Sequence, residues 1–83
     1  MRLVIAAPAN GAILKDALKA HLQNDPRVSS LVDLSSPKGT YPQLSFAAAE
    51  EVAAGRADRA LLICGTGVGT AIAANKVRGI RAA

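Results

Sequence analysis

The stretch that decides the fold runs from Ala60 to Thr70 and reads Ala-Leu-Leu-Ile-Cys-Gly-Thr-Gly-Val-Gly-Thr. Its first part, Ala60–Cys64, is an unbroken apolar run, which is typical of a parallel strand covered on both faces. Gly65 to Gly69 then form a tight glycine loop. The small residues of Thr70–Val77 predict a helix that ends near Gly79. A strand, a glycine loop and a helix in direct succession indicate an α/β fold.

The rest of the chain repeats this alternation of strands and helices. Further strands are expected at Arg2–Ala7, Val28–Leu34 and Ile80–Ala83, and further helices at Ala12–Asn24 and Gln43–Ala54. Pro42 suits a first helical turn, and Gly55 is expected to end the second helix. The alternation predicts an open parallel sheet with right-handed crossovers and helices on both faces, in three α/β/α layers.

The first expected helix has an apolar stripe. Leu14, Leu18 and Leu22 recur every four residues, and Ile13 and Ala17 lie beside them. This spacing predicts that the stripe faces the core and that the polar residues of the opposite face are solvated. Those polar residues are Lys15, Asp16, Lys19 and Gln23.

Length and composition limit the class of protein. The chain has 83 residues, which is enough for one domain spanning 1–83. Alanine supplies 18 residues, while Tyr41 and Phe46 are the only aromatic residues, so a thin core that relies on a second subunit is expected. The lone Cys64 excludes an internal disulfide, and no apolar run approaches a membrane span. These features favour a soluble protein of the cytoplasm.

The charge balance favours an anionic partner. Ten Lys and Arg residues against six Asp and Glu residues give a formal net charge of +4. The basic residues are scattered, apart from Lys76, Arg78 and Arg81, and aromatic residues for base stacking are scarce. Neither nucleic acid nor a membrane is therefore expected as a partner, whereas a phosphorylated small molecule fits.

The glycine loop is the strongest chemical feature of the sequence. It follows the carboxyl end of an expected strand, the place where ligands bind in open α/β sheets. Glycines there let several backbone N–H groups converge beside a helix N-terminus and so bind an anion, either a phosphate or an oxyanion formed during a reaction. The spacing Gly65-x-Gly67-x-Gly69 is neither the dinucleotide fingerprint nor the NTPase phosphate loop.

Cys64 stands directly before this loop. A thiol near a helix N-terminus can have a lowered pKa and act as a nucleophile or as a base, but an inert core cysteine fits the same position. Thr66 and Thr70 are open in the same way, either as ligand-facing hydroxyls or as loop and cap residues. His21, the only histidine, is interpreted as a surface residue, and no residues have metal-ligand spacing.

Taken together, these segments resemble the type B ribose-5-phosphate isomerase family, which includes galactose-6-phosphate isomerase and related sugar-phosphate isomerases. The resemblance is carried by Leu62–Gly69, Ile72–Val77 and Gly79–Ala83. Supporting matches are Met1-Arg2, Gly11, Leu14-Lys15, Tyr41-Pro42 and Ala57-Asp58-Arg59. The resemblance spans the whole chain but only about the N-terminal half of a family member.

The resemblance implies a flavodoxin-like (Rossmann-like) sheet and an aldose–ketose isomerisation through an enediolate, without metal or cofactor. Cys64 would be the base, and Thr66 would serve the sugar's oxygens. The residues that would hold the enediolate or line the sugar pocket are Gly65, Gly67, Val68, Gly69, Thr70, Tyr41 and Asn10. Many family members carry Asp-His where this chain has Pro8 and Ala9, and Asn10 beside them can still form a hydrogen bond.

Three functional interpretations stay open. The chain is a sugar-phosphate isomerase of the ribose-5-phosphate type, or a phosphate-binding module without chemistry, or a non-catalytic subunit or fragment that assembles with another chain. Cys64 with Thr66 favours the first, whereas Pro8 and Ala9 favour the last. We expect the chain to be truncated, with Ile80–Ala83 as an unfinished edge strand beyond the third strand. An exposed edge of this kind favours a homo-oligomer, either a dimer or a tetramer.

Overall fold

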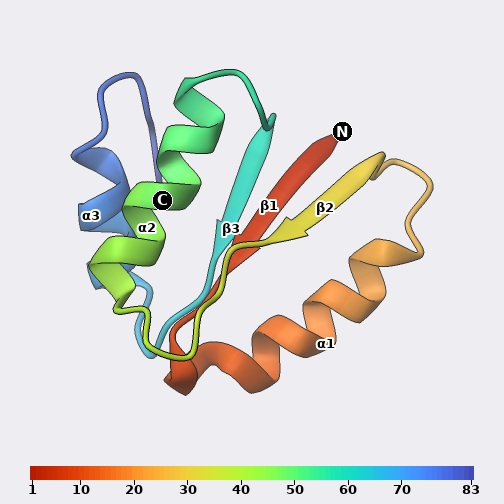
Figure 1. The fold of residues 1–83 in the computed structure, drawn as a ribbon, viewed down its shortest axis with the longest axis horizontal. Coiled ribbons are helices and arrows are strands. Elements are labelled where there is room, and N and C mark those ends of the chain that lie inside the picture. Colours follow the sequence, from red (N-terminus) through yellow and green to blue (C-terminus); the bar gives the residue numbers. More distant parts are fainter.

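A computed structural model describes all residues from 1 to 83 and shows one parallel sheet between layers of helices (Figure 1). The strands are β1 (Arg2–Ala6), β2 (Ser30–Asp33) and β3 (Arg59–Leu62), in the order β2-β1-β3. The helices are α1 (Ala12–Gln23), α2 (Tyr41–Ala53) and α3 (Val68–Asn75), with a short 3-10 turn, η1 (Ala9–Gly11), before α1. The predicted flavodoxin-like arrangement, with the first strand in the middle, is confirmed.

Alternate residues of β1 supply the two halves of the core. Val4 packs with Ala48 and Ala57 on the side covered by α2. Its neighbour Ile5 packs with Ala7 and Ile63 on the opposite side. Successive side chains of a strand point to opposite faces, so the central strand β1 is covered on both faces. Figure 1 shows α1 on one side of the sheet and α2 with α3 on the other.

Small residues allow α2 and α3 to pack closely. Ala48 and Ala49 of α2 and Ala73 and Ala74 of α3 are buried. Helices that meet through alanine bring their backbones close together, but each contact removes little apolar surface from water. The predicted alanine-based core is therefore present, and α3 is held by small side chains directly after the glycine loop.

The element boundaries differ from the sequence expectations by at most two residues. β2 covers only Ser30–Asp33 of the expected Val28–Leu34, and α2 begins at Tyr41, two residues before the expected start. The Oε1 atom of Gln43 accepts the Thr40 N–H at 3.2 Å, so the chain is already turned into the helix before Pro42.

The expected orientation of α1 is wrong at its N-terminal end. Leu18 and Leu22 are half-buried as predicted, but Leu14 is 56% exposed and Ile13 is 91% exposed. Lys15, which was expected to face solvent, is only 8% exposed. The helix is rotated because Lys15 forms an ion pair with a carboxylate beneath α1, and this carboxylate belongs to a strand of the sheet.

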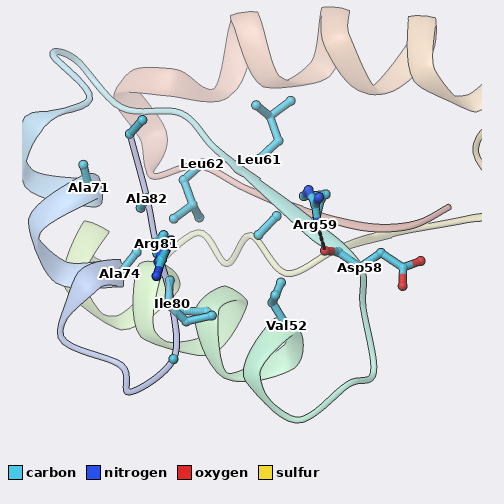
Figure 2. Close-up of a pocket in the computed structure, with 14 residues that line it drawn as sticks. Val52, Asp58, Arg59, Leu61, Leu62, Ala71, Ala74, Ile80, Arg81 and Ala82 are labelled. Atoms are coloured by element: carbon cyan, nitrogen blue, oxygen red, sulfur yellow. Dashed lines mark hydrogen bonds between the residues drawn. The ribbon is translucent and has the colours of Figure 1, made fainter.

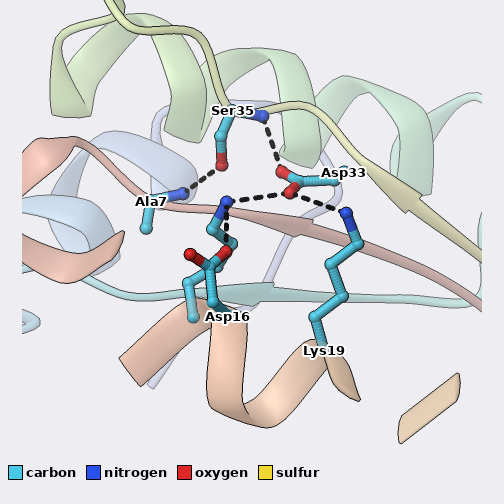
Figure 3. A network of polar contacts seen from close by, with 6 residues as sticks. Ala7, Asp16, Lys19, Asp33 and Ser35 are labelled. Atoms are coloured by element: carbon cyan, nitrogen blue, oxygen red, sulfur yellow. Dashed lines mark hydrogen bonds and ion pairs between the residues drawn. The ribbon is translucent and has the colours of Figure 1, made fainter. Parts of the chain in front are cut away.

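That partner is Asp33 at the end of β2 (Figure 3). The Nζ atoms of Lys15 and Lys19 lie 2.9 and 3.3 Å from Asp33 Oδ2, and Lys15 also pairs with Asp16 at 3.0 Å. The Ser35 amide donates to Asp33 Oδ1 at 2.9 Å, and the Ser35 hydroxyl accepts the Ala7 N–H at 3.0 Å. This network joins α1 to the ends of β2 and β1.

The network also sets the charge state of its members. Burial raises the pKa of Asp33, but the hydrogen bonds from Lys15, Ser35 and Lys19 outweigh it and leave that pKa well below its usual range. The pKa of Lys15 is raised, chiefly by its hydrogen bond to Asp33. Both groups are therefore charged at neutral pH, and the pair ties α1 to the sheet.

The prediction of a fourth strand at Ile80–Ala83 is wrong. The sheet contains only β1, β2 and β3. The side chain of Asn75 binds both backbone groups of Ala82, accepting its N–H at 2.8 Å and donating to its carbonyl at 3.0 Å. Ala82 therefore has its peptide groups satisfied without pairing to β3.

An apolar groove of about 540 Å³ separates the segment 80–83 from β3 (Figure 2). The third strand was expected to be covered on both faces, but Leu61 and Leu62 are only half-buried. The reason is that β3 is an edge strand.

None of the helices has the length and hydrophobicity that a membrane span requires.

Candidate functional site

The glycine loop lies where β3 ends and α3 begins. Ile63 extends the pairing one step beyond β3, since its N–H donates to the Ala6 carbonyl at 3.1 Å. Cys64 follows at the carboxyl end of the strand, as predicted. Gly67 has a φ of +78°, a backbone conformation that strongly favours glycine, and this turn lets α3 begin at Val68. The helix therefore starts two residues earlier than expected and includes Val68, Gly69 and Thr70.

The sulfur of Cys64 faces donors from the loop and the helix. The Gly67 N–H donates to Sγ at 3.0 Å, and Thr70 Oγ1 lies 3.6 Å from Sγ. The hydrogen bond with the Thr70 hydroxyl is the main cause of a lowered pKa of Cys64. Burial opposes this effect, and the amides of Gly67, Thr66 and Thr70 add to it. Donors directed at a sulfur favour its thiolate form, so this cysteine is more acidic than a free one.

Some of the other donors of the loop have a hydrogen-bond partner in the chain, and others, called open here, have none. The Val68 N–H donates to Thr66 Oγ1 at 3.3 Å, and the Thr70 hydroxyl donates to the Gly67 carbonyl at 3.0 Å. The amides of Gly65 and Gly69 have no hydrogen-bond partner in the chain. Two backbone donors are thus open beside the cysteine, and the Thr66 hydroxyl keeps its own proton for a further acceptor.

These groups border a cavity of about 730 Å³ between the N-terminal ends of α2 and α3. Its lining residues are Pro8, Asn10, Thr40, Tyr41, Cys64, Gly65, Thr66, Val68, Gly69 and Ile72. The cavity joins most of the predicted site residues from three separate parts of the chain. Gly67 and Thr70 do not line it, and Thr70 is buried at 4% exposure. Both lie behind the cysteine, in contact with its sulfur.

Tyr41 reaches the loop because Gly69 has no side chain. A Cβ at Gly69 would lie 2.5 Å from Tyr41 Cε1, well inside contact distance. The tyrosine is 45% exposed at the start of α2. The glycine therefore permits the close approach of an aromatic side chain to the first turn of α3.

Sequence reasoning missed Pro8, Thr40 and Ile72 as lining residues. The pattern Thr40-x-x-Gln43 resembles a capping box. This signal could have identified Thr40 as the residue that caps the helix beginning at Tyr41. Ile72 follows Val68 by four residues, so the two share one face of α3. Pro8 belongs to the loop that carries Asn10, and the signal that could have found it is the family resemblance, in which Asp-His occupies the positions of Pro8 and Ala9.

The charge of the cavity is low. None of its lining residues is Lys, Arg, His, Asp or Glu, and Tyr41 is the only titratable side chain besides Cys64. No group of three or more His, Cys, Asp or Glu residues lies together in the structure. His21 is exposed on α1, as expected. The groove beside β3 contains none of the predicted site residues, so the cavity at the glycine loop is the candidate site.

The fold and this strand–loop–helix site define an α/β protein with a thiol at the carboxyl end of a parallel strand. Residues 3–83 match the family model described as Ribose/Galactose Isomerase, and the chain belongs to this family of sugar-phosphate isomerases. Similar proteins include D-erythrulose-4-phosphate isomerase 2 from Mycolicibacterium smegmatis, which is 51% identical over 86 aligned residues. Ribose-5-phosphate isomerase B from Escherichia coli is 47% identical over 73 aligned residues.

The chain spans about half the length of these relatives. The first match covers 99% of this chain and 57% of the M. smegmatis protein, and the second covers 87% of this chain and 49% of the E. coli protein. The structure of Clostridium thermocellum ribose-5-phosphate isomerase B is similar, with a TM-score of 0.89 and 36% identity. That match covers 98% of this chain and 55% of that structure. The predicted resemblance to the N-terminal half of this family is confirmed.

Proposed function

We propose that the complete protein interconverts an aldose phosphate and a ketose phosphate through an enediolate, with Cys64 as the base. One observation carries this proposal: Cys64 lines the cavity, and its sulfur accepts the Gly67 N–H at 3.0 Å. The lowered pKa of Cys64 favours its thiolate over that of a free cysteine, and a base beside a bound sugar is what proton abstraction next to a carbonyl requires.

The proposed reaction moves one proton between neighbouring carbons. The Cys64 thiolate removes the proton from the carbon beside the carbonyl, and the C–H electron pair becomes the double bond of the enediolate. The resulting thiol then returns its proton to the former carbonyl carbon, while the proton of the neighbouring hydroxyl passes to the former carbonyl oxygen. The old hydroxyl thereby becomes the new carbonyl, and no oxidant or reductant is consumed. The enediolate oxygen carries the negative charge in between, and donors placed at that oxygen lower the barrier.

The open amides of Gly65 and Gly69 suit that oxygen, because both residues line the cavity and neither amide has another acceptor. The Thr66 hydroxyl, which accepts from the Val68 N–H, has its proton free to donate to a sugar oxygen. Val68 and Tyr41 would form apolar walls of the sugar pocket, and Asn10 offers an amide for hydroxyl groups. The Gly67 and Thr70 residues of the predicted anion loop act on the sulfur instead.

The substrate class follows from the relatives rather than from the cavity. The names of similar proteins specify ribose 5-phosphate and D-erythrulose 4-phosphate, so we propose a pentose or tetrose phosphate. No cationic side chain lines the cavity, so a phosphate would be bound there by backbone N–H groups, or by cations from outside the lining residues. The phosphate-binding module and the non-catalytic subunit both stay alternatives.

A homo-oligomer stays part of the proposal. Large apolar side chains are exposed, with Val68 and Ile72 at the cavity at 61% and 57% and Leu14 of α1 at 56%. A small alanine-based core also has little stability to spare. Light scattering at micromolar concentration tests this, and a concentration-independent monomer contradicts it. A cytoplasmic location stays a prediction.

Replacement of the cysteine tests the function. Cys64→Ala in the complete protein should lower turnover of ribose 5-phosphate or erythrulose 4-phosphate by about 10²–10⁴-fold, the usual contribution of a general base. The substrate concentration at half-maximal rate should change little. His21→Asn on the exposed surface of α1 is the matched control and should retain wild-type turnover. Unchanged turnover in Cys64→Ala would refute the role of the thiol. A wild-type protein inactive on every sugar phosphate would support the non-catalytic alternative.

A further inference from the structure

The Thr70 hydroxyl lies between two acceptors behind the candidate base. It donates to the Gly67 carbonyl at 3.0 Å and lies 3.6 Å from the sulfur of Cys64. A hydroxyl has one proton to donate and two lone pairs to accept. While its proton points to the carbonyl, Thr70 can only accept from the Cys64 thiol. The structure therefore shows an arrangement that suits the protonated cysteine.

The thiolate requires the opposite arrangement. A deprotonated sulfur has no proton to donate, and a lone pair of the Thr70 oxygen facing it would be repulsive. Rotation of the O–H bond alone lets Thr70 donate to the thiolate, and the Gly67 carbonyl then loses that bond. The Gly67 N–H points to the sulfur at 3.0 Å and can serve either state as a donor.

We propose that Thr70 is a positioning residue for Cys64, whose hydroxyl accepts from the thiol, turns, and donates to the thiolate. This inference rests on the proposed function, in which Cys64 must give up a proton and regain it in every cycle. Thr70 is buried and does not line the cavity, so it can follow the sulfur's charge without contacting the sugar. This positioning role of Thr70 differs from the contact with substrate that the sequence suggested.

Because the surroundings of the sulfur are uncharged, the Thr70 hydroxyl has a large influence on the ionisation of Cys64. The groups that face the cavity come from the η1 loop, α2, α3 and the end of β3, and none carries a formal charge. Tyr41 of α2 is the only other titratable lining group. The causes of the lowered pKa of Cys64 are hydrogen bonds, first that of Thr70, and no cation is among them. No nearby positive charge can therefore replace the hydroxyl when it is removed.

The chain offers a direct test, because Cys64 is its only cysteine. The rate of alkylation by iodoacetamide, followed by mass spectrometry between about pH 5 and pH 10, reports the ionisation of this one thiol. Thr70→Val keeps the shape and removes the hydroxyl. It should raise the midpoint by about one to two pH units, the shift expected for loss of one hydrogen bond to a charged group. Thr70→Ser restores the hydroxyl and should restore the midpoint.

Two further variants separate the proposed role from a structural one. Thr66→Val is the matched control, since the Thr66 hydroxyl accepts from Val68 and does not contact the sulfur, so the alkylation midpoint should not move. Thr70→Ala replaces Thr70→Val if the valine variant does not fold, as judged by circular dichroism. An unchanged midpoint in the folded valine or alanine variant overturns the proposal, and so does a serine variant that resembles valine.

The alkylation assay needs no substrate, so it fails independently of the isomerase proposal. A shifted midpoint together with full turnover in Cys64→Ala would leave the contact in place and refute the catalytic base. In the complete protein, the acidic limb of the pH–rate profile should move in Thr70→Val by the same interval as the alkylation midpoint. A profile that loses amplitude without moving contradicts the proposed role of the hydroxyl.

Discussion

The buried pair of Lys15 and Asp33 allows a quantitative test of how α1 is fixed to the sheet. Asp33→Asn removes the negative charge while preserving shape, and the asparagine can still accept the Ser35 N–H. The two charged side chains are 10% and 17% exposed, and their closest atoms are 2.9 Å apart. Loss of a hydrogen bond between charged groups costs about 1.5–3 kcal/mol, and a lysine left buried adds to the cost.

A value near the lower end is expected, about 2 kcal/mol, because Lys15 keeps its second partner Asp16. Urea denaturation at pH 7, followed by circular dichroism, should show a midpoint lower by about 1–2 M for a domain of this size. Asp16→Asn is the matched control. Asp16 touches the same lysine at 3.0 Å, but its side chain is 68% exposed, so its loss should cost less than about 0.5 kcal/mol.

The pH dependence has a defined sign. The folded-state pKa of Asp33 is lowered, so its stabilising contribution is complete above the unfolded value of about 4 and is lost as the pH falls through the folded value. The pKa of Lys15 is raised, so its contribution is complete below about 10.4 and is lost at still higher pH. The difference between wild type and Asp33→Asn should therefore be constant from about pH 5 to pH 9 and shrink below pH 4. A difference that equals the Asp16→Asn effect, or that persists unchanged in acid, refutes this reasoning.

Three further substitutions probe the site and the core. Gly69→Ala places a Cβ 2.5 Å from Tyr41 Cε1, so the ring must move; isomerase turnover of the complete protein should fall about tenfold or more, with a urea midpoint close to wild type. Gly67→Val forces a β-branched residue into a φ of +78° and shifts the amide that faces Cys64, so alkylation at neutral pH should slow in a folded but less stable protein. Ser45→Ala removes a fully buried hydroxyl without a hydrogen-bond partner and should raise the free energy of unfolding by about 1 kcal/mol, as thermal denaturation would show.

Local sequence patterns correctly predicted the order of the first three strands and the three α-helices, the parallel sheet and the position of Cys64. Each depends on residues that are neighbours in the chain. The apolar run before Gly65 can only be a strand or a buried helix segment, and the glycines after it end the strand at once. Gly55 follows the end of α2 and Gly79 lies in the turn after α3, and both have a positive φ.

The same patterns failed where a residue's partner lies outside its own segment of the chain. Lys15 was expected in solvent because a four-residue stripe cannot show that Asp33, 18 residues later, is buried beneath the helix. Ile80–Ala83 was expected to be a strand because it continues the alternation of strands and helices, but the Asn75 side chain satisfies the backbone of Ala82. Propensity is a property of a segment, whereas pairing depends on which groups the fold places beside it.

The candidate site divides in the same way. The sequence by itself determined that a thiol would stand at the carboxyl end of a strand beside a glycine loop, because strand, loop and helix are contiguous. The tertiary structure was needed to show that Thr70 and the Gly67 amide face the sulfur, that the Gly65 and Gly69 amides stay open, and that Tyr41 lines the same cavity. The reason is that hydrogen-bond direction depends on the φ of Gly67 and on the packing of α2 against α3, and no run of residue types specifies either of them.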